Sequence, residues 1–121
     1  MNNKFYCLIF VLTTILISEE KLKQARVTEY FATQTIDYVE SVRVNGDSKE
    51  YLFIRQTNAY LARAKAYLEL GEIELALEDI NKVIVREPYK LEPYFYRGRI
   101  FSILENYPDA AANYDKSEER R

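Results

Sequence analysis

Residues 57–90 read TNAYLARAKAYLELGEIELALEDINKVIVREPYK, and residues 91–121 read LEPYFYRGRIFSILENYPDAAANYDKSEERR. Placing Thr57 on Leu91 aligns the two stretches without a gap. In this register similar residues also stand opposite each other at Ala64/Gly98, Tyr67/Phe101, Ile73/Tyr107 and Ile80/Tyr114. A fixed period of this length indicates that one supersecondary unit occurs twice. The identical pairs are Tyr60/Tyr94, Arg63/Arg97, Leu70/Leu104, Ala76/Ala110, Lys82/Lys116 and Arg86/Arg120.

We expect each unit to be a pair of helices. Apolar side chains recur three and four residues apart over 60–68 and again over 73–84, which is the pattern of one helix face. Gly71 lies between the two patterns, where glycine commonly ends a helix, and Pro88 closes the unit. Small residues on the facing helices allow close packing. The sequence therefore predicts an all-α fold of antiparallel helix pairs over 57–121.

This pattern resembles the tetratricopeptide repeat (TPR), a helix–turn–helix unit with a period of about 34 residues. The resemblance covers two repeats, 57–90 and 91–121, and implies a short α-solenoid. The second repeat departs from the family pattern at Glu105, where glycine is usual, and at Ser117, where a small apolar residue is usual. The matching residues are Tyr60, Ala64, Tyr67, Gly71, Ala76, Ile80, Val83 and Pro88, then Tyr94, Gly98, Phe101, Ala110 and Tyr114.

The resemblance also implies a binding site for a peptide or protein partner. In TPR proteins the first helices of successive repeats line a concave groove. Lys65 and Arg99 lie one repeat apart, so two cations would stand beside aromatic side chains and suit a peptide with an acidic and an apolar group. The alternative is a solvated polar face with scattered basic residues. By this resemblance the groove residues are Asn58, Leu61, Ala62, Lys65, Glu69, Glu92, Phe95, Tyr96, Arg99 and Ile103.

The composition narrows the chemistry that this chain can perform. It has no histidine, Cys7 is its single cysteine, and its net charge is −2 with both signs mixed along the sequence. Neither a Cys/His zinc site nor a Ser–His or Cys–His nucleophile can be assembled, and no basic block attracts nucleic acid. We therefore expect a protein-binding module that is not an enzyme and has no catalytic residue, cofactor or metal.

The first eighteen residues are a different kind of sequence. Phe5–Ile17 (FYCLIFVLTTILI) runs without a charge between Lys4 and Glu19. As a helix it spans about 20 Å, short of the ~30 Å hydrocarbon core of a bilayer. Three interpretations are open: a cleaved export signal, a membrane or interfacial tether, and a buried N-terminal helix. The first two predict an exported (secreted or periplasmic) or membrane-tethered protein, and the third a cytoplasmic one.

The region 19–56 does not match the repeat. It mixes helix-forming with β-branched residues, and we favour a helix over Leu22–Val42. Asn45-Gly46 between apolar runs is also a hairpin signal. A β-hairpin that pairs Ile36–Val44 with Tyr51–Ile54 is therefore the alternative.

The last helix pair of the repeat region has apolar residues that the sequence leaves without an obvious cover. Repeat arrays usually need about three units and a polar terminal helix. No further unit follows to cover Tyr107 and Tyr114 in this sequence. Residues 22–44 could pack there, two chains could cap each other, or the chain could be part of a longer array. Mutual capping gives the alternative function, a self-associating structural component at a membrane.

Overall fold

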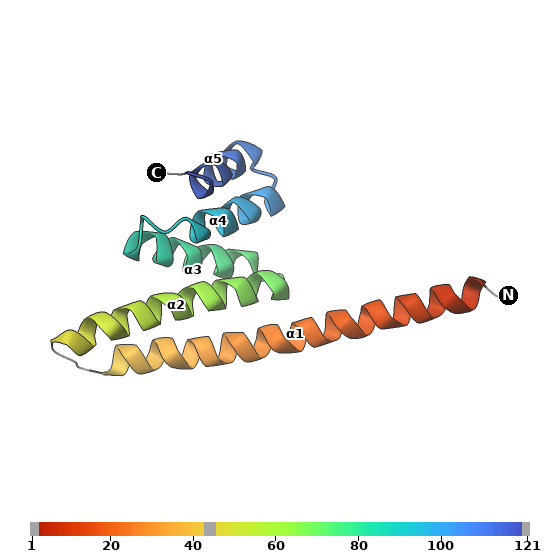
Figure 1. Ribbon diagram of the computed structural model, residues 1–121, viewed down its shortest axis with the longest axis horizontal. Coiled ribbons are helices and arrows are strands. Elements are labelled where there is room, and N and C mark those ends of the chain that lie inside the picture. Colours follow the sequence, from red (N-terminus) through yellow and green to blue (C-terminus); the bar gives the residue numbers. More distant parts are fainter. Residues whose placement is uncertain (1–2, 43–45, 120–121) are drawn as a thin grey trace.

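A computed structural model describes residues 3–42 and 46–119. These residues form helices without any strand, so the prediction of an all-α fold is confirmed for the described part of the chain. Figure 1 shows the helices stacked in chain order. Their bounds are α1 Asn3–Ser41, α2 Asp47–Leu70, α3 Ile73–Arg86, α4 Glu92–Ile103 and α5 Tyr107–Ser117.

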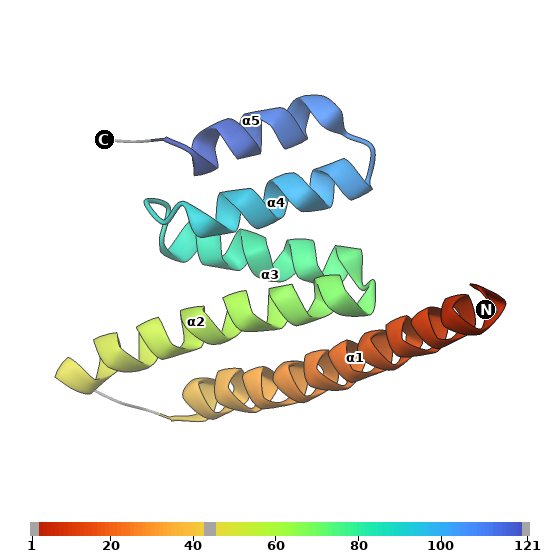
Figure 2. The ribbon, with the colours of Figure 1, turned by 45° about the vertical axis from the view of Figure 1, so that its right-hand side comes forward.

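Each helix packs on the one that follows it in sequence. Contacts join α1 to α2, α2 to α3, α3 to α4 and α4 to α5, and a smaller set joins α2 to α4. Figure 2 shows the same order from a second direction, with neighbouring helices running back and forth. Most packing is therefore local in sequence, and the α2–α4 contact is the one that brings two alternate helices together among the described elements.

The described residues of 19–56 lie in α1 and α2, apart from Val42 and Gly46, and the hairpin alternative is wrong. Ile36 lies in α1, and Tyr51–Ile54 lies in α2; residues 43–45, which include Asn45, lie outside the described residues. In α1, Ala25, Ala32 and Ile36 are buried at helical spacing. The main-chain oxygen of Ile36 accepts a hydrogen bond from Gln56 Nε2 at 3.2 Å. Burial of this face against α2 outweighs the weak strand preference of the β-branched residues.

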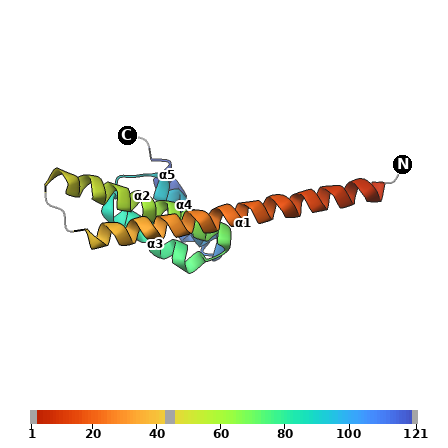
Figure 3. The same cartoon turned by 90° about the horizontal axis from the view of Figure 1, so that it is seen from below.

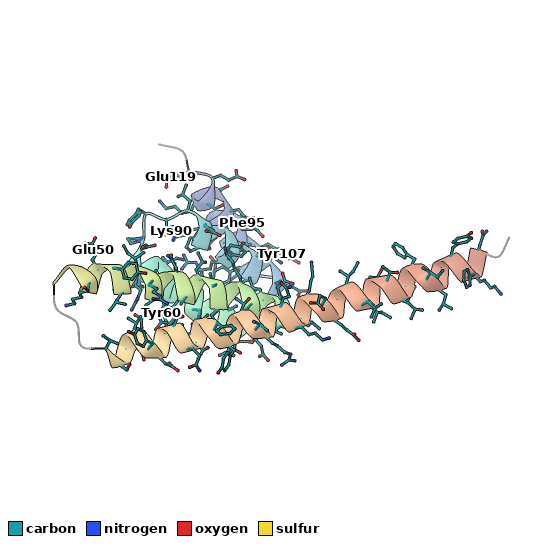
Figure 4. All side chains as sticks on the ribbon, turned by 60° about the horizontal axis from the view of Figure 1, so that its bottom comes forward. Glu50, Tyr60, Lys90, Phe95, Tyr107 and Glu119 are labelled. Atoms are coloured by element: carbon teal, nitrogen blue, oxygen red, sulfur yellow. The ribbon has the colours of Figure 1, made fainter. Side chains whose placement is uncertain are left out.

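The core lies where α2 and α3 meet and extends to α1 and α4. Ala64 and Ala76 are completely buried, and their small side chains let α2 and α3 approach closely. Ile80 and Ile100 fill the space beside them and are also completely buried. Tyr60, labelled in Figure 4, closes the core toward α1 through a hydrogen bond of 3.4 Å from its hydroxyl to Glu40.

The turns inside the two helix pairs have the same geometry at equivalent positions of the repeat. Gly71 ends α2 in the left-handed conformation, with φ at 77°, and Glu105 occupies the equivalent position after α4, with φ at 60°. At both turns the next residue donates its N–H to the carbonyl five residues back at 2.8 Å. The backbone therefore repeats at this point although the residue type does not.

An arginine links the two helices of each pair. Arg63 on α2 donates to both carboxylate oxygens of Asp79 on α3, at 2.7 and 2.9 Å. These hydrogen bonds and the charge of Asp79 outweigh burial and raise the pKa of Arg63. Arg97 on α4 makes the equivalent link to α5 with one hydrogen bond, from its Nε to Asn113 Oδ1 at 2.7 Å. Each guanidinium also lies over the tyrosine three residues earlier, at 5.7 and 5.4 Å from the ring centroids.

The N-terminal half of α1 extends beyond the stack, as Figures 1 and 3 show. The apolar side chains of Phe5–Ile17 are exposed there, so the alternative of a buried N-terminal helix is wrong for this structure. None of the helices in the described ranges is both long enough and apolar enough to cross a membrane.

The remainder of α1 lies at the opposite end of the stack from α5. It packs on α2, and no contact joins α1 to α5 among the described elements. The described part of residues 22–44 therefore does not cover Tyr107, and the first of the three explanations for the end of the repeat region is ruled out. Tyr107 is 63% exposed.

Candidate functional site

A groove of about 860 Å³ lies between α1, α2 and α4. Every residue that the resemblance placed in a groove lines it, except Phe95 and Ile103. The full lining comprises Ile17, Glu20, Lys21, Gln24, Ala25 and Thr28 from α1, Asn58, Leu61, Ala62, Lys65, Ala66 and Glu69 from α2, and Lys90, Glu92, Tyr96 and Arg99 from α4 and the segment before it.

The lining residues of α1 and α2 follow one spacing. On each of these helices they recur alternately three and one residues apart, over 17–28 and over 58–69, which marks a single helix face. Ala25, Leu61 and Ala66 are buried and form an apolar floor, while the longer polar side chains stand along the rim. An apolar floor with few polar groups is typical of ligand-binding grooves, as is a volume of this order.

The wall contributed by α1 was not predicted from the sequence. The resemblance covered 57–121 and therefore assigned the groove to the first helices of the repeats. A signal was present, because Ala25 is a small residue among long polar ones on the face shared with Lys21 and Thr28. Only the packing of α1 on α2 shows that this face turns toward the groove.

Lys65 is held by a partner on the next repeat. Its ammonium group forms an ion pair with Glu92 and lies 5.1 Å from the centroid of the Tyr96 ring. Burial by itself lowers the pKa of Lys65, but the hydrogen bond to Glu92 and the charge of Glu92 outweigh it, so the pKa is raised. Lys65 therefore stays charged and joins α2 to α4 across the groove.

Lys65 and Arg99 both line the groove, but they differ in their partners. Arg99 is exposed and has no hydrogen bond or ion pair within residues 3–42 and 46–119, whereas Lys65 is paired. Lys90 is also engaged, with Glu87 at 3.3 Å and Asn58 at 3.4 Å. The reason is that Glu92, at the start of α4, reaches across to Lys65 on α2.

Lys21 on the α1 wall is the other cation of the groove with no such partner among the described side chains. Glu20 and Glu69 are the corresponding acidic groups. The groove therefore offers uncommitted charges of both signs around its apolar floor.

Phe95 and Ile103 lie outside the groove, so their prediction as groove residues is corrected. Phe95 is displaced from Tyr96 round the helix by about 100° and faces α5 instead. Its ring lies 5.9 Å from the Tyr114 ring and 5.3 Å from the Tyr96 ring, between centroids. Ile103 ends α4 and is exposed.

No group of three His, Cys, Asp or Glu side chains within the described ranges could hold a metal ion. Comparison with known proteins finds no family model, curated protein or solved structure that matches this chain. The groove and the internal repeat are therefore the features from which a function can be inferred.

Proposed function

We propose that this chain is a TPR-type protein-binding module that holds a peptide segment of a partner protein in the groove between α1, α2 and α4. The observation that carries the proposal is the groove itself, in which faces of three helices converge on one apolar floor. Preformed concave sites of this volume, with a few polar groups around an apolar floor, are the usual geometry of ligand recognition. The recurrence of turns and arginine contacts in both repeats supports the TPR-type architecture.

The free groups around the floor define the kind of peptide. Leu61 and Tyr96 offer an apolar surface for an anchoring side chain. Arg99 has a guanidinium with no partner among the described residues, and it can bind a carboxylate through two parallel hydrogen bonds. Glu69, likewise uncommitted within the described ranges, favours a basic group elsewhere in the same peptide. We therefore infer a peptide with one apolar anchor and charges of both signs, including at least one carboxylate.

The test is selection of peptides from a random display library on the purified full-length protein, followed by calorimetry. Arg99→Glu reverses the free charge, and Tyr96→Ala removes the aromatic wall. Each is expected to weaken a selected peptide at least about tenfold, the loss of one charged or anchoring contact. Arg55→Glu makes the same charge change on an exposed arginine of α2 outside the groove and should leave the affinity unchanged.

Two outcomes contradict the proposal. One is that no peptide is enriched above an unrelated helical protein. The other is that Arg55→Glu weakens binding as much as Arg99→Glu, which would place binding on the general surface charge and not in the groove.

A second function, self-association through the last helix pair, is favoured by a separate observation. Helix α5 contacts α4 and no other described element, so its outer side has no neighbour. Ile103, Leu104 and Tyr107 are exposed at this end. A second copy that covered them would cap the array as an additional repeat does.

Sedimentation of the full-length protein over a wide concentration range tests this function. If copies cap each other, Tyr107→Glu is expected to lower the association constant at least about tenfold by placing a charge in the apolar contact. Tyr51→Glu is the matched control, because Tyr51 on α2 has the same exposed fraction, 63%. A protein that stays monomeric at the highest concentration contradicts self-association and leaves peptide binding unaffected.

A further inference from the structure

The free half of α1 has apolar side chains in every direction. Leu8, Ile9, Phe10 and Val11 are consecutive and all exposed, and Phe10 reaches 73%. Successive residues of a helix point about 100° apart, so four in a row cover its whole circumference. The segment Phe5–Ile17 therefore has no polar face.

The threonine hydroxyls within this segment satisfy their hydrogen bonds inside the helix. Thr13 Oγ1 donates to the carbonyl of Ile9 at 2.8 Å, and Thr14 Oγ1 donates to that of Phe10 at 2.9 Å. From Cys7 onward the backbone N–H groups of the segment are paired along the helix as well. Both hydroxyls thus have partners without water, which is the condition for residing in a hydrocarbon medium.

The shape of the apolar surface identifies the medium that covers it. A protein groove or a single neighbouring helix covers one stripe and leaves the rest in water, whereas lipid chains surround a helix on all sides. The segment is about 20 Å long, more than half of the ~30 Å hydrocarbon core and less than all of it. Glu19, Glu20 and Lys21 follow it closely and end the apolar stretch.

We propose that Phe5–Ile17 inserts at a tilt into one leaflet of a lipid bilayer, because its length of about 20 Å exceeds the leaflet's half of the ~30 Å hydrocarbon core, and that α1 thereby holds the groove at the membrane surface. Ile17 ends the inserted segment, and Ile17, Glu20 and Lys21 line the groove, so the groove opens within about one helical turn of the lipid. That the groove binds a peptide rests on the proposed function, whereas the insertion of α1 into lipid does not. A partner would then present its peptide close to a membrane.

A tryptophan reporter tests insertion, because the natural chain contains no tryptophan. Phe10→Trp in the full-length protein is mixed with phosphatidylcholine vesicles, with and without brominated acyl chains. We expect its emission to shift to shorter wavelength and to be quenched by bromine, equally in low and in high salt. Tyr89→Trp, in an exposed turn before α4, is the control and should respond to neither lipid.

A charge in the segment provides the second measurement. Leu12→Lys is expected to weaken vesicle binding at least about tenfold, since a lysine is strongly disfavoured in hydrocarbon. Val85→Lys places the same charge at an exposed apolar position of α3 and should leave vesicle binding unchanged. Leu12→Lys lies outside the groove, so its affinity for a selected peptide in solution should not change. Loss of peptide affinity and loss of lipid binding are thus distinguished.

Three results would overturn the proposal. The first is an emission of Phe10→Trp that does not respond to vesicles. The second is a shift that appears without lipid and grows with protein concentration, which would assign the segment to contacts between copies. The third is a protein isolated from its native cells whose measured mass corresponds to a chain that begins at Glu19, which would show that the segment is removed.

Discussion

At the scale of single residues, Glu105 has a strained backbone conformation. It is the one residue other than glycine with positive φ in the described chain, at 60°. A side chain in the left-handed region costs about 1–2 kcal/mol because its Cβ crowds the following carbonyl. The sequence marks this position as a departure from the repeat, and the structure shows that the turn keeps its geometry. The hydrogen bonds that close the turn hold it in place.

Glu105→Gly is therefore expected to raise the free energy of unfolding by about 1 kcal/mol, part of the strain being offset by the extra freedom of glycine in the unfolded chain. Glu105→Ala keeps the Cβ and should change the stability by less than about 0.5 kcal/mol. Gly71→Ala, at the equivalent turn, should lower it by about 1 kcal/mol. Urea unfolding of the three variants measures this. Equal gains from alanine and glycine at position 105 would contradict the explanation by backbone strain.

At the scale of helices, the two helix pairs pack closely at equivalent positions of the repeat but with residues of different size. In the first pair Ala64 on α2 and Ile80 on α3 belong to the same core cluster, and both are completely buried. In the second pair the equivalent positions are Gly98 and Tyr114. A Cβ added to Gly98 would lie 2.8 Å from ring carbons of Tyr114, which is closer than such atoms approach. The larger ring on α5 is thus accommodated by the missing side chain on α4.

Whether Gly98→Ala stabilises or destabilises the protein should depend on the residue at position 114. Gly98→Ala alone is expected to destabilise the protein by about 1 kcal/mol, because overpacking exceeds the gain in helix propensity. In the background of Tyr114→Ile, which recreates the pair of the first repeat, the same change should stabilise it by about 0.5–1 kcal/mol. Thermal unfolding of the double-mutant cycle checks this. The same sign in both backgrounds would show that the two residues do not constrain each other.

At the scale of the whole molecule, α1 has two parts with different surroundings. Its second half buries Ala32 and Ile36 against α2, and its first half projects beyond the other helices. Only the part that is buried contributes to the free energy of folding in water. The groove lies at the junction of the two parts, where Ile17 and Lys21 face α2 and α4.

Removal of residues 1–16 is accordingly expected to change the free energy of unfolding by less than about 1 kcal/mol, because little apolar surface is buried there. Ile36→Ala, at a residue only 3% exposed, should cost about 2–4 kcal/mol through the cavity that it leaves. Denaturant unfolding in the absence of lipid compares the two. A truncation that costs as much as Ile36→Ala would mean that the apolar segment packs on the rest of the protein.

Much of the groove could be predicted from the sequence, because local periodicity gave the helices and the resemblance to TPR proteins gave the helix faces that line it. Spacing of three and four residues determines which side chains share a helix face, and the period of the repeat determines which faces of two helices are equivalent. The resemblance to TPR proteins placed Asn58, Leu61, Lys65, Tyr96 and Arg99 in one groove, and they line one groove in the structure.

The sequence by itself thus determined the helices of the repeat region, the helix end at Gly71 and the shared face of α2 and α4. Only the tertiary structure decided that α1 is the third wall, that Glu92 pairs with Lys65 and that Phe95 faces α5. The physical reason is that helix formation, and which side chains share a helix face, depend on residues close together in the sequence. Ion pairs between helices and the walls of the groove depend on which helices pack together in space. For α1 this is determined by its packing on α2.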